Sequence, residues 1–187
     1  MFKLQTKARK AETKGETNQL RREGCIPAVI YAHGTSGKSV SISGVEFDAC
    51  MRNVRKGHLS TTRFNLVDEN GEKAEAVIKE IQYNPTNYQP IHIDFEELVQ
   101  DVPVNIKVPI ECVGVADCVG IKLGGVLRQV IRSLKVRCLP KDIPSEFKID
   151  VRKLQIKEKR RLSDLKIPET VRPLAKLQEV AVVIAKR

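Results

Sequence analysis

The residues from 76 to 95 have the pattern of a β-hairpin, and this pattern constrains the fold more than any other in the sequence. Residues 76–83 are rich in strand-forming types, and a polar turn with a proline follows. In residues 91–95, apolar side chains alternate with His92 and Asp94. Such alternation places the apolar side chains on a core and the polar ones in solvent. The chain must therefore build a sheet with one buried and one polar face.

The first strand of this hairpin does not alternate strictly. A regular strand would put Ile78 on the face of Gln82, and Lys79 on the face of Ile81. A β-bulge near Glu80 would turn both isoleucines inward and both polar residues outward. We therefore predict a bulge there. The outer face then carries Lys79, Gln82, His92 and Asp94.

Other alternating segments predict a mainly β protein. In the first half, strands are expected at 2–10, 27–31, 38–42 and 61–67, with a helix at 45–56, a helical turn at 18–24 and a loop at 9–17. In the second half, strands are expected at 104–110, 147–151, 179–185 and the end of 126–138, with a loop at 113–125. Short strands with few helices favour a small barrel. We predict an amino-terminal β-barrel domain with one or two short helices, residues 1–95, and a carboxy-terminal β-rich domain, residues 96–187.

The charge of the chain favours a polyanionic partner. The 187 residues include 33 Lys and Arg against 23 Asp and Glu, a net charge of +10. Basic side chains release counterions from a nucleic-acid backbone, although a solvated basic surface is the simpler alternative. The chain has no Trp, and aromatic residues make up 4%. Structured RNA is therefore a better candidate than an extended single strand, which needs stacking platforms.

The cysteines and the apolar segments exclude several classes. The five cysteines (25, 50, 112, 118 and 138) are odd in number and contain no Cys-x-x-Cys pair, which predicts free thiols without a metal site or a disulfide framework. No cofactor is predicted. No apolar run is long enough for a membrane span, and the first residues lack a signal core, so a cytoplasmic protein is expected.

Residues 32–39, Ala-His-Gly-Thr-Ser-Gly-Lys-Ser, suggest an alternative function. They approach the pattern of a phosphate-binding loop and follow a predicted strand. A nucleotide hydrolase would need a helix directly after this loop, because helix N–H groups hold the phosphates. The alternation at 40–42 predicts a strand instead, so the non-enzymatic interpretation is preferred. A further basic run, residues 157–161, is compatible with a phosphate contact, but a solvated loop is the commoner explanation.

Ordered motifs along nearly the whole chain resemble one family. They are Leu20-Arg-Arg-Glu-Gly-Cys-Ile-Pro-Ala-Val-Ile-Tyr31, Ile81-Gln-Tyr-Asn-Pro85, Ile91-His-Ile-Asp-Phe95, Gly124-Gly-Val-Leu127, Val136-Arg-Cys-Leu-Pro-Lys-Asp-Ile-Pro144 and Ser163-Asp-Leu-Lys-Ile-Pro168. The chain resembles the bacterial large-subunit ribosomal proteins that bind 5S rRNA, the L-twenty-five family, in its long two-domain form (the CTC or general stress protein type).

The resemblance implies a barrel that docks on the loop E region of 5S rRNA in the large ribosomal subunit. Carried over by position, the RNA-facing residues would be Arg9, Lys14, Thr17, Arg21, Tyr31, Lys79, Gln82, His92 and Asp94. The Arg and Lys side chains suit phosphates, whereas amide, imidazole and carboxylate groups suit base edges or 2′-hydroxyls. The chain departs from some relatives, which carry arginines at Asn18 and Gln19, an amide at Lys79 and a His at Asn84.

The resemblance does not identify the partner of the second domain. Residues 95–187 contain 19 basic and 12 acidic residues, a net charge of +7, against +3 for residues 1–94. This charge suits rRNA, and neighbouring ribosomal proteins are equally compatible partners. A transfer-RNA-binding module remains the other non-enzymatic alternative, because a similar barrel face would serve it.

Overall fold

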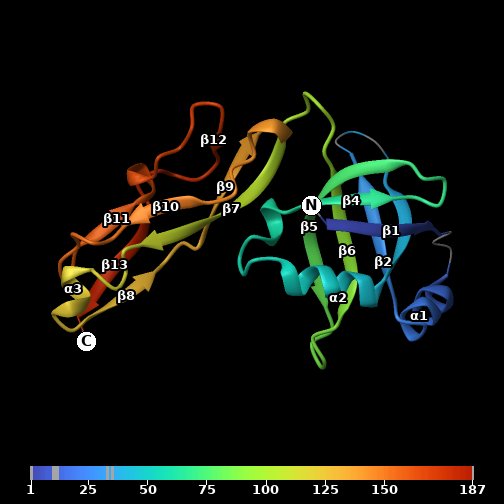
Figure 1. Ribbon diagram of the computed structural model, residues 1–187, viewed down its shortest axis with the longest axis horizontal. Coiled ribbons are helices and arrows are strands. Elements are labelled where there is room, and N and C mark those ends of the chain that lie inside the picture. The colour runs from blue at the N-terminus through green and yellow to red at the C-terminus, as the bar shows by residue number, and fades with distance from the viewer. Residues whose placement is uncertain (1, 10–12, 33, 35, 187) are drawn as a thin grey trace. The chain divides into compact units, whose positions relative to one another are not determined.

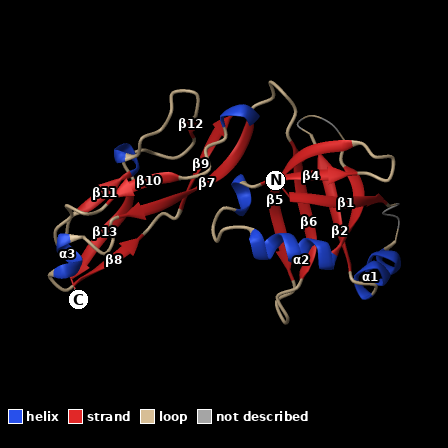
Figure 2. Cartoon of the chain, viewed as in Figure 1, coloured by secondary structure: helices blue, strands red, loops and turns tan. Residues whose placement is uncertain are grey.

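The computed structural model describes residues 2–9, 13–32, 34 and 36–186, and the chain divides into two compact units. The first comprises residues 1–104 and the second residues 105–187. Both are built mainly of strands (Figure 1, Figure 2). This confirms the predicted fold class. The domain boundary expected after residue 95 stays a prediction.

The first unit is a closed six-stranded barrel. Its strands are β1 (Phe2–Ala8), β2 (Cys25–Tyr31), β3 (Lys38–Ser43), β4 (Arg63–Val67), β5 (Lys73–Tyr83) and β6 (Pro90–Glu97), in the order β1-β3-β2-β6-β5-β4. Parallel pairing of β1 with β4 and of β2 with β6 closes the sheet, and the other pairs are antiparallel. Closure leaves no free strand edge, so every barrel strand finds a partner on both sides.

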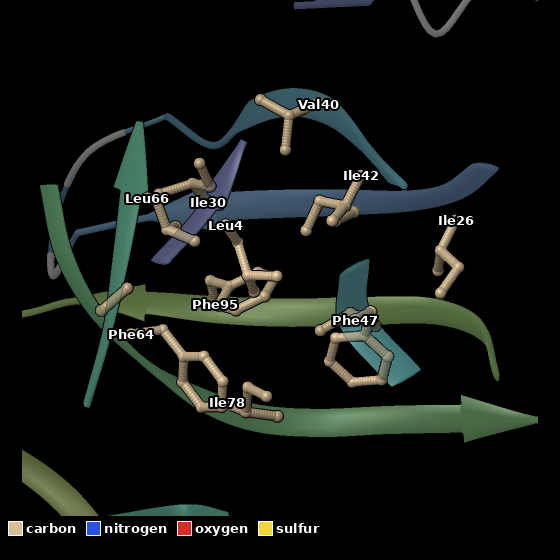
Figure 3. Close-up of a cluster of buried hydrophobic side chains, with 13 residues drawn as sticks. Leu4, Ile26, Ile30, Val40, Ile42, Phe47, Phe64, Leu66, Ile78 and Phe95 are labelled. Atoms are coloured by element: carbon tan, nitrogen blue, oxygen red, sulfur yellow. The ribbon is translucent and has the colours of Figure 1, made fainter. Parts of the chain in front are cut away.

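The barrel interior is filled by inward-facing apolar residues from every strand (Figure 3). Phe64 and Phe95 meet edge to face, with ring centroids 6.2 Å apart. Phe47 enters from helix α2 (Gly44–Asn53) and is 1% exposed, so it belongs to the same core. Fully burying side chains of this size stabilises the fold by about 1.5–3 kcal/mol each.

Helix α1 (Lys14–Arg22) is longer than the single turn predicted at 18–24. The expected loop at 9–17 is therefore wrong from Lys14 onward, and residues 10–12 lie outside the described residues. Thr13 caps the helix, because its side chain accepts a hydrogen bond from Glu16 N at 3.3 Å. A Ser or Thr followed three residues later by Glu is a known start signal, which the interpretation of this stretch as a loop overlooked. Gly24 follows the helix with φ +78°, as expected for the residue that ends it.

The remaining elements of the first unit match the predicted order. Helix α2 ends at Asn53, before the expected residue 56, and a short 3₁₀ turn, η1 (Leu59–Thr61), follows. The turn between β4 and β5 closes through a hydrogen bond from Gly71 N to Asp68 O at 2.9 Å.

The predicted bulge lies between Ile78 and Glu80. Ile78 pairs with Phe95 and Glu80 with Asp94, so Lys79 is the extra residue on β5. Ile78 is buried in the barrel core, whereas Gln82 lies on the exposed side. The parity argument from the sequence is therefore confirmed.

The second unit contains two small sheets. One has the order β10 (Phe147–Asp150), β7 (Val104–Val113), β9 (Ser133–Cys138), β12 (Arg172–Pro173), and the other the order β11 (Lys159–Arg161), β13 (Val180–Lys186), β8 (Gly125–Gln129). The expected loop at 113–125 is wrong in part, because it contains the short helix α3 (Val119–Lys122). Two 3₁₀ turns complete the unit, η2 (Pro140–Asp142) and η3 (Leu162–Asp164).

All five cysteines are free thiols, as predicted. Within the described ranges, no helix is long and apolar enough to cross a membrane.

Candidate nucleic-acid interface

The outer face of the β5–β6 hairpin brings together the polar residues predicted there. Gln82 lies directly opposite His92 across the two strands, and Asp94 lies opposite Glu80. Directly opposite residues on one face have Cβ atoms about 4.5–5.5 Å apart, so these side chains form one continuous surface. On its other side, Asp94 pairs with Val29 of β2.

His92 and Asp94 make a close contact along β6. His92 Nδ1 lies 2.7 Å from Asp94 Oδ1. Within the described part of the chain the buried Nδ1 nevertheless has no hydrogen-bond partner, so this close approach is a contact without a formed hydrogen bond. Because Nδ1 is buried against Asp94, Nε2 is the nitrogen available to an outside partner.

Lys79 is tied to a carboxylate that the sequence analysis missed. Its Nζ lies 2.5 Å from Glu96 Oε2, and Glu96 is only 7% exposed. Glu96 was expected to begin the second domain, whereas it is the next outward residue of β6 after Asp94. The alternation along β6 places Glu96 on the same outward face as His92 and Asp94, so this pattern could have predicted its position. The charge of Lys79 is therefore compensated within the barrel.

Tyr31 ends β2 beside this acidic group, paired with Glu96 in the strand register. Burial raises the pKa of the Tyr31 phenol, and the negative charges of Glu96, Asp94 and Glu80 raise it further. The phenol therefore stays protonated and can donate a hydrogen bond from the edge of the hairpin face. The local field on this part of the face is negative, which the sequence alone did not indicate.

Two arginines form the basic part of the candidate interface. Arg21 of α1 donates from Nε and Nη2 to the carbonyl oxygen of Ile91, at 3.2 and 3.1 Å. Arg9 donates from Nε to the carbonyl oxygen of Val40 at 3.0 Å. The pKa of the Arg9 guanidinium is lowered, first by burial and then by the positive charge of Arg21. The two cations therefore lie near enough to repel each other, and among the described residues neither has a carboxylate partner.

Lys14 and Thr17, which the resemblance implies to be RNA-facing, lie on α1, where a loop was expected. The Thr17 hydroxyl donates to the Thr13 carbonyl at 3.3 Å, and Lys14 is exposed in the first turn. Among the described residues, no hydrogen bond or ion pair joins either side chain to β5 or β6.

The phosphate-loop alternative loses its structural basis. Lys38 begins strand β3, so no helix N-terminus follows the loop to hold phosphates. His33 and Thr35 of that motif lie outside the described residues.

The tip of the hairpin carries two exposed tyrosines that the sequence analysis did not consider. Tyr88 is 79% exposed and has a left-handed backbone, φ +55°. The tip is held by hydrogen bonds from Asn84 N to Gln89 O and from Tyr88 N to Asn84 O, at 2.8 and 2.9 Å. Tyr83 is also exposed. Exposed aromatic residues on an ordered turn are typical of binding surfaces.

Comparison with known proteins identifies the family. Residues 4–95 match the model of the ribosomal L25p family, and residues 103–187 match that of the ribosomal protein TL5, C-terminal domain. Over the full length of both chains, the sequence is 44% identical to the large ribosomal subunit protein bL25 of Chlamydia abortus. It is 42% and 43% identical to the proteins of that name from Chlamydia pneumoniae and Chlamydia muridarum, again over both full lengths. The chain belongs to the L25 family of ribosomal proteins, in the form that carries a TL5-type carboxy-terminal domain.

Proposed function

We propose that this chain is a constituent of the large ribosomal subunit that binds 5S rRNA at its loop E region through the barrel. The proposal rests on two arginines: Arg21 donates to the Ile91 carbonyl of the hairpin strand β6, and the positive charge of Arg21 acts on Arg9. Both guanidiniums are oriented by backbone carbonyls, and within the described part of the chain neither has a carboxylate partner. The pKa of Arg9 is lowered first by burial and then by the positive charge of Arg21, and an RNA phosphate bound by both cations would offset that charge repulsion.

The hairpin face supplies groups suited to reading RNA structure. Gln82 offers both a donor and an acceptor, His92 a ring nitrogen, and Asp94 an acceptor. These groups suit base edges and 2′-hydroxyls in the wide minor groove of an RNA helix. Lys79 acts on this face indirectly, because its ammonium holds Glu96. Lys14 and Thr17 of α1 are the remaining residues that we propose to face the RNA.

A gel-shift titration against 5S rRNA, with transfer RNA as competitor, tests the proposal at two salt concentrations. Replacing Arg21 by Ala should weaken binding and lower the slope of log K against log salt by about 1. Arg22→Ala is the matched control, since Arg22 is the next residue of α1, carries the same charge and is exposed. Equal effects of the two substitutions would argue against a specific contact at Arg21.

Sequence-specific contacts have a separate signature. Gln82→Ala should reduce the preference for 5S rRNA over transfer RNA while it leaves the salt slope unchanged, because an amide neutralises no phosphate. If the unsubstituted chain shows no preference between the two RNAs, the 5S proposal fails.

The assignment of binding to the barrel also remains a proposal. A fragment that ends at residue 95 would lack Glu96 and the hydrogen bond from Leu98 N to Glu75 O at 2.7 Å. A fragment of residues 1–104 keeps both and follows the compact unit. It should bind 5S rRNA as tightly as the full chain if the barrel is sufficient.

A further inference from the structure

A dense group of cations lies on the second unit, far along the chain from the barrel residues proposed to bind 5S rRNA. Residues 152–161 contain six Lys and Arg against one Glu. They comprise a turn and the strand β11, which is an edge strand of the sheet β11-β13-β8 (Figure 1). We call this segment the edge-strand patch.

The edge-strand patch is an ordered surface, not a solvated loop. Leu154 is 2% exposed, and its carbonyl accepts a hydrogen bond from Gly120 N at 2.8 Å. Lys157 N donates to Ile184 O at 2.8 Å, and Ile184 N donates to Glu158 O at 3.0 Å. The turn is thus fastened to the buried strand β13. The cations it carries are held at fixed backbone positions before any partner arrives, which lowers the entropic cost of binding.

Lys157 occupies a backbone conformation that lysine rarely adopts. Its φ is +71° at the third position of a turn closed by a hydrogen bond from Glu158 N to Gln155 O at 3.1 Å. A turn with positive φ at this position favours Gly or Asn. Residues held in sparsely populated backbone conformations cluster at functional sites, where the side chain has a role beyond forming the turn. Here that side chain is a cation.

Among the residues that the structure describes, most cations of the patch have no carboxylate partner. Of the acids nearby, the Glu158 carboxylate accepts a hydrogen bond from Gln155 N at 2.8 Å, and Asp164 approaches Arg160 only at 4.0 Å. Arg152 does have a carboxylate partner, because its Nη2 lies 2.6 Å from Asp150 Oδ2. A depression of about 520 Å³ lies within the patch, and its lining is Lys153, Leu154, Lys157, Glu158, Lys159 and Arg160.

We infer that the edge-strand patch is a second RNA-binding surface, which receives the phosphate backbone of an RNA helix in the depression lined by Lys153, Lys157, Lys159 and Arg160. Lysine ammonium groups and one guanidinium on a rigid edge are suited to successive phosphates, which carry no sequence information. The patch belongs to the second unit and shares no residue with the barrel interface, so it does not depend on the 5S rRNA proposal.

An RNA backbone fits this surface better than an acidic protein does. The lining of the depression is predominantly cationic, with Leu154 as its one apolar residue. Protein interfaces have an apolar, aromatic core inside a polar rim, and the lining lacks such a core. Counterion release by clustered Lys and Arg is instead the main source of affinity for a nucleic-acid backbone.

The test measures binding of the full chain to an RNA duplex of about 20 base pairs that has no internal loop. The patch variant carries Lys157→Gln, Lys159→Gln and Arg160→Gln. The matched control carries Lys107→Gln, Lys135→Gln and Arg137→Gln, which remove the same charge from exposed positions of β7 and β9. The patch variant should bind about tenfold more weakly or worse at about 0.1 M salt, with a salt slope lower by about 2–3. The control should change affinity less than about threefold.

A single substitution separates binding from folding. Lys157→Gly removes the cation and relieves the left-handed backbone, so its melting temperature should be unchanged or higher while RNA affinity falls. A fall in melting temperature with unchanged affinity would assign Lys157 to the turn alone and overturn its role in binding.

Three further outcomes would overturn the inference. They are an equal loss in the patch variant and the control, an unchanged affinity in the patch variant, and patch-dependent binding of polyglutamate that is tighter than binding of the duplex. All variants are also measured with Arg21→Ala added. The patch effect should persist there, so that failure of the barrel proposal and failure of this inference can be told apart.

Discussion

The pair Lys79–Glu96 provides a test of how the hairpin face is built. Glu96 is buried at 7% exposure, and its carboxylate lies against the Lys79 ammonium. Lys79→Met keeps the aliphatic stem but removes the cation, which leaves a buried carboxylate without its partner. Breaking a fully buried pair in this way costs about 3–5 kcal/mol. Because the Lys79 side chain is 36% exposed, water screens part of this loss, and we expect about 1–3 kcal/mol.

The opposite substitution should cost less. Glu96→Gln leaves an ammonium that can turn toward water, so we expect a loss of less than about 1 kcal/mol. The double variant should be more stable than Lys79→Met alone, because neither an unpaired anion nor an unpaired cation remains. This order of stabilities follows from burial of the carboxylate rather than from the strength of the pair.

Tyrosine fluorescence during urea unfolding measures these differences selectively. The chain has three tyrosines and no Trp, and Tyr31, Tyr83 and Tyr88 all lie in the barrel unit. The signal therefore reports the barrel without interference from the second unit. A Glu96→Gln variant less stable than Lys79→Met would refute the argument. A Lys79→Met variant with unchanged stability, but with a 5S rRNA salt slope lower by about 0.9, would show Lys79 to be a direct phosphate contact.

Three further predictions concern the frame that carries these surfaces. Phe47→Ala should destabilise the barrel by about 3–5 kcal/mol in the same urea assay, because Phe47 is 1% exposed in the core; a cost below about 1 kcal/mol would contradict this. Gly44→Ala should lower the stability of the barrel by about 1–3 kcal/mol, since a Cβ there would lie 2.6 Å from Gly24 O. Gly15→Ala in α1 is the control, because its Cβ would meet nothing closer than 3.9 Å and should not destabilise the barrel. Asp150→Asn should lower the calorimetric melting temperature at pH 7. Its hydrogen bonds with Arg152 lower the pKa of Asp150 to about 2, so its stabilising effect is present above pH 3.8 and is lost as the pH falls toward 2. The gap between the two proteins should close over that range, and a gap that persists at pH 2 would contradict the assignment.

Local sequence was sufficient for much of the hairpin. The break in alternation at Lys79 required an extra residue on β5, and the bulge lies there. The predicted helical turn ended at Gly24, and in the structure Gly24 follows α1 with the positive φ, +78°, that is common where helices end. These predictions succeed because strand parity and glycine conformation depend on adjacent residues. The start of α1 was missed although its capping signal, Thr13 and Glu16, is local. The reason is that residues 9–17 show no helical period of apolar residues.

Tertiary structure decided the chemistry of the surfaces. The contact between Lys79 and Glu96 spans 17 residues, and that between Arg21 and Ile91 spans 70. Only closure of the barrel brings such residues together, so no local pattern could show that Lys79 is compensated or that Arg9 lies near Arg21. Likewise, by composition alone a solvated loop was the commoner explanation of the basic run at 157–161. Its attachment to β13 makes it a fixed cationic edge, because hydrogen bonds between distant strands determine which charges are held rigidly.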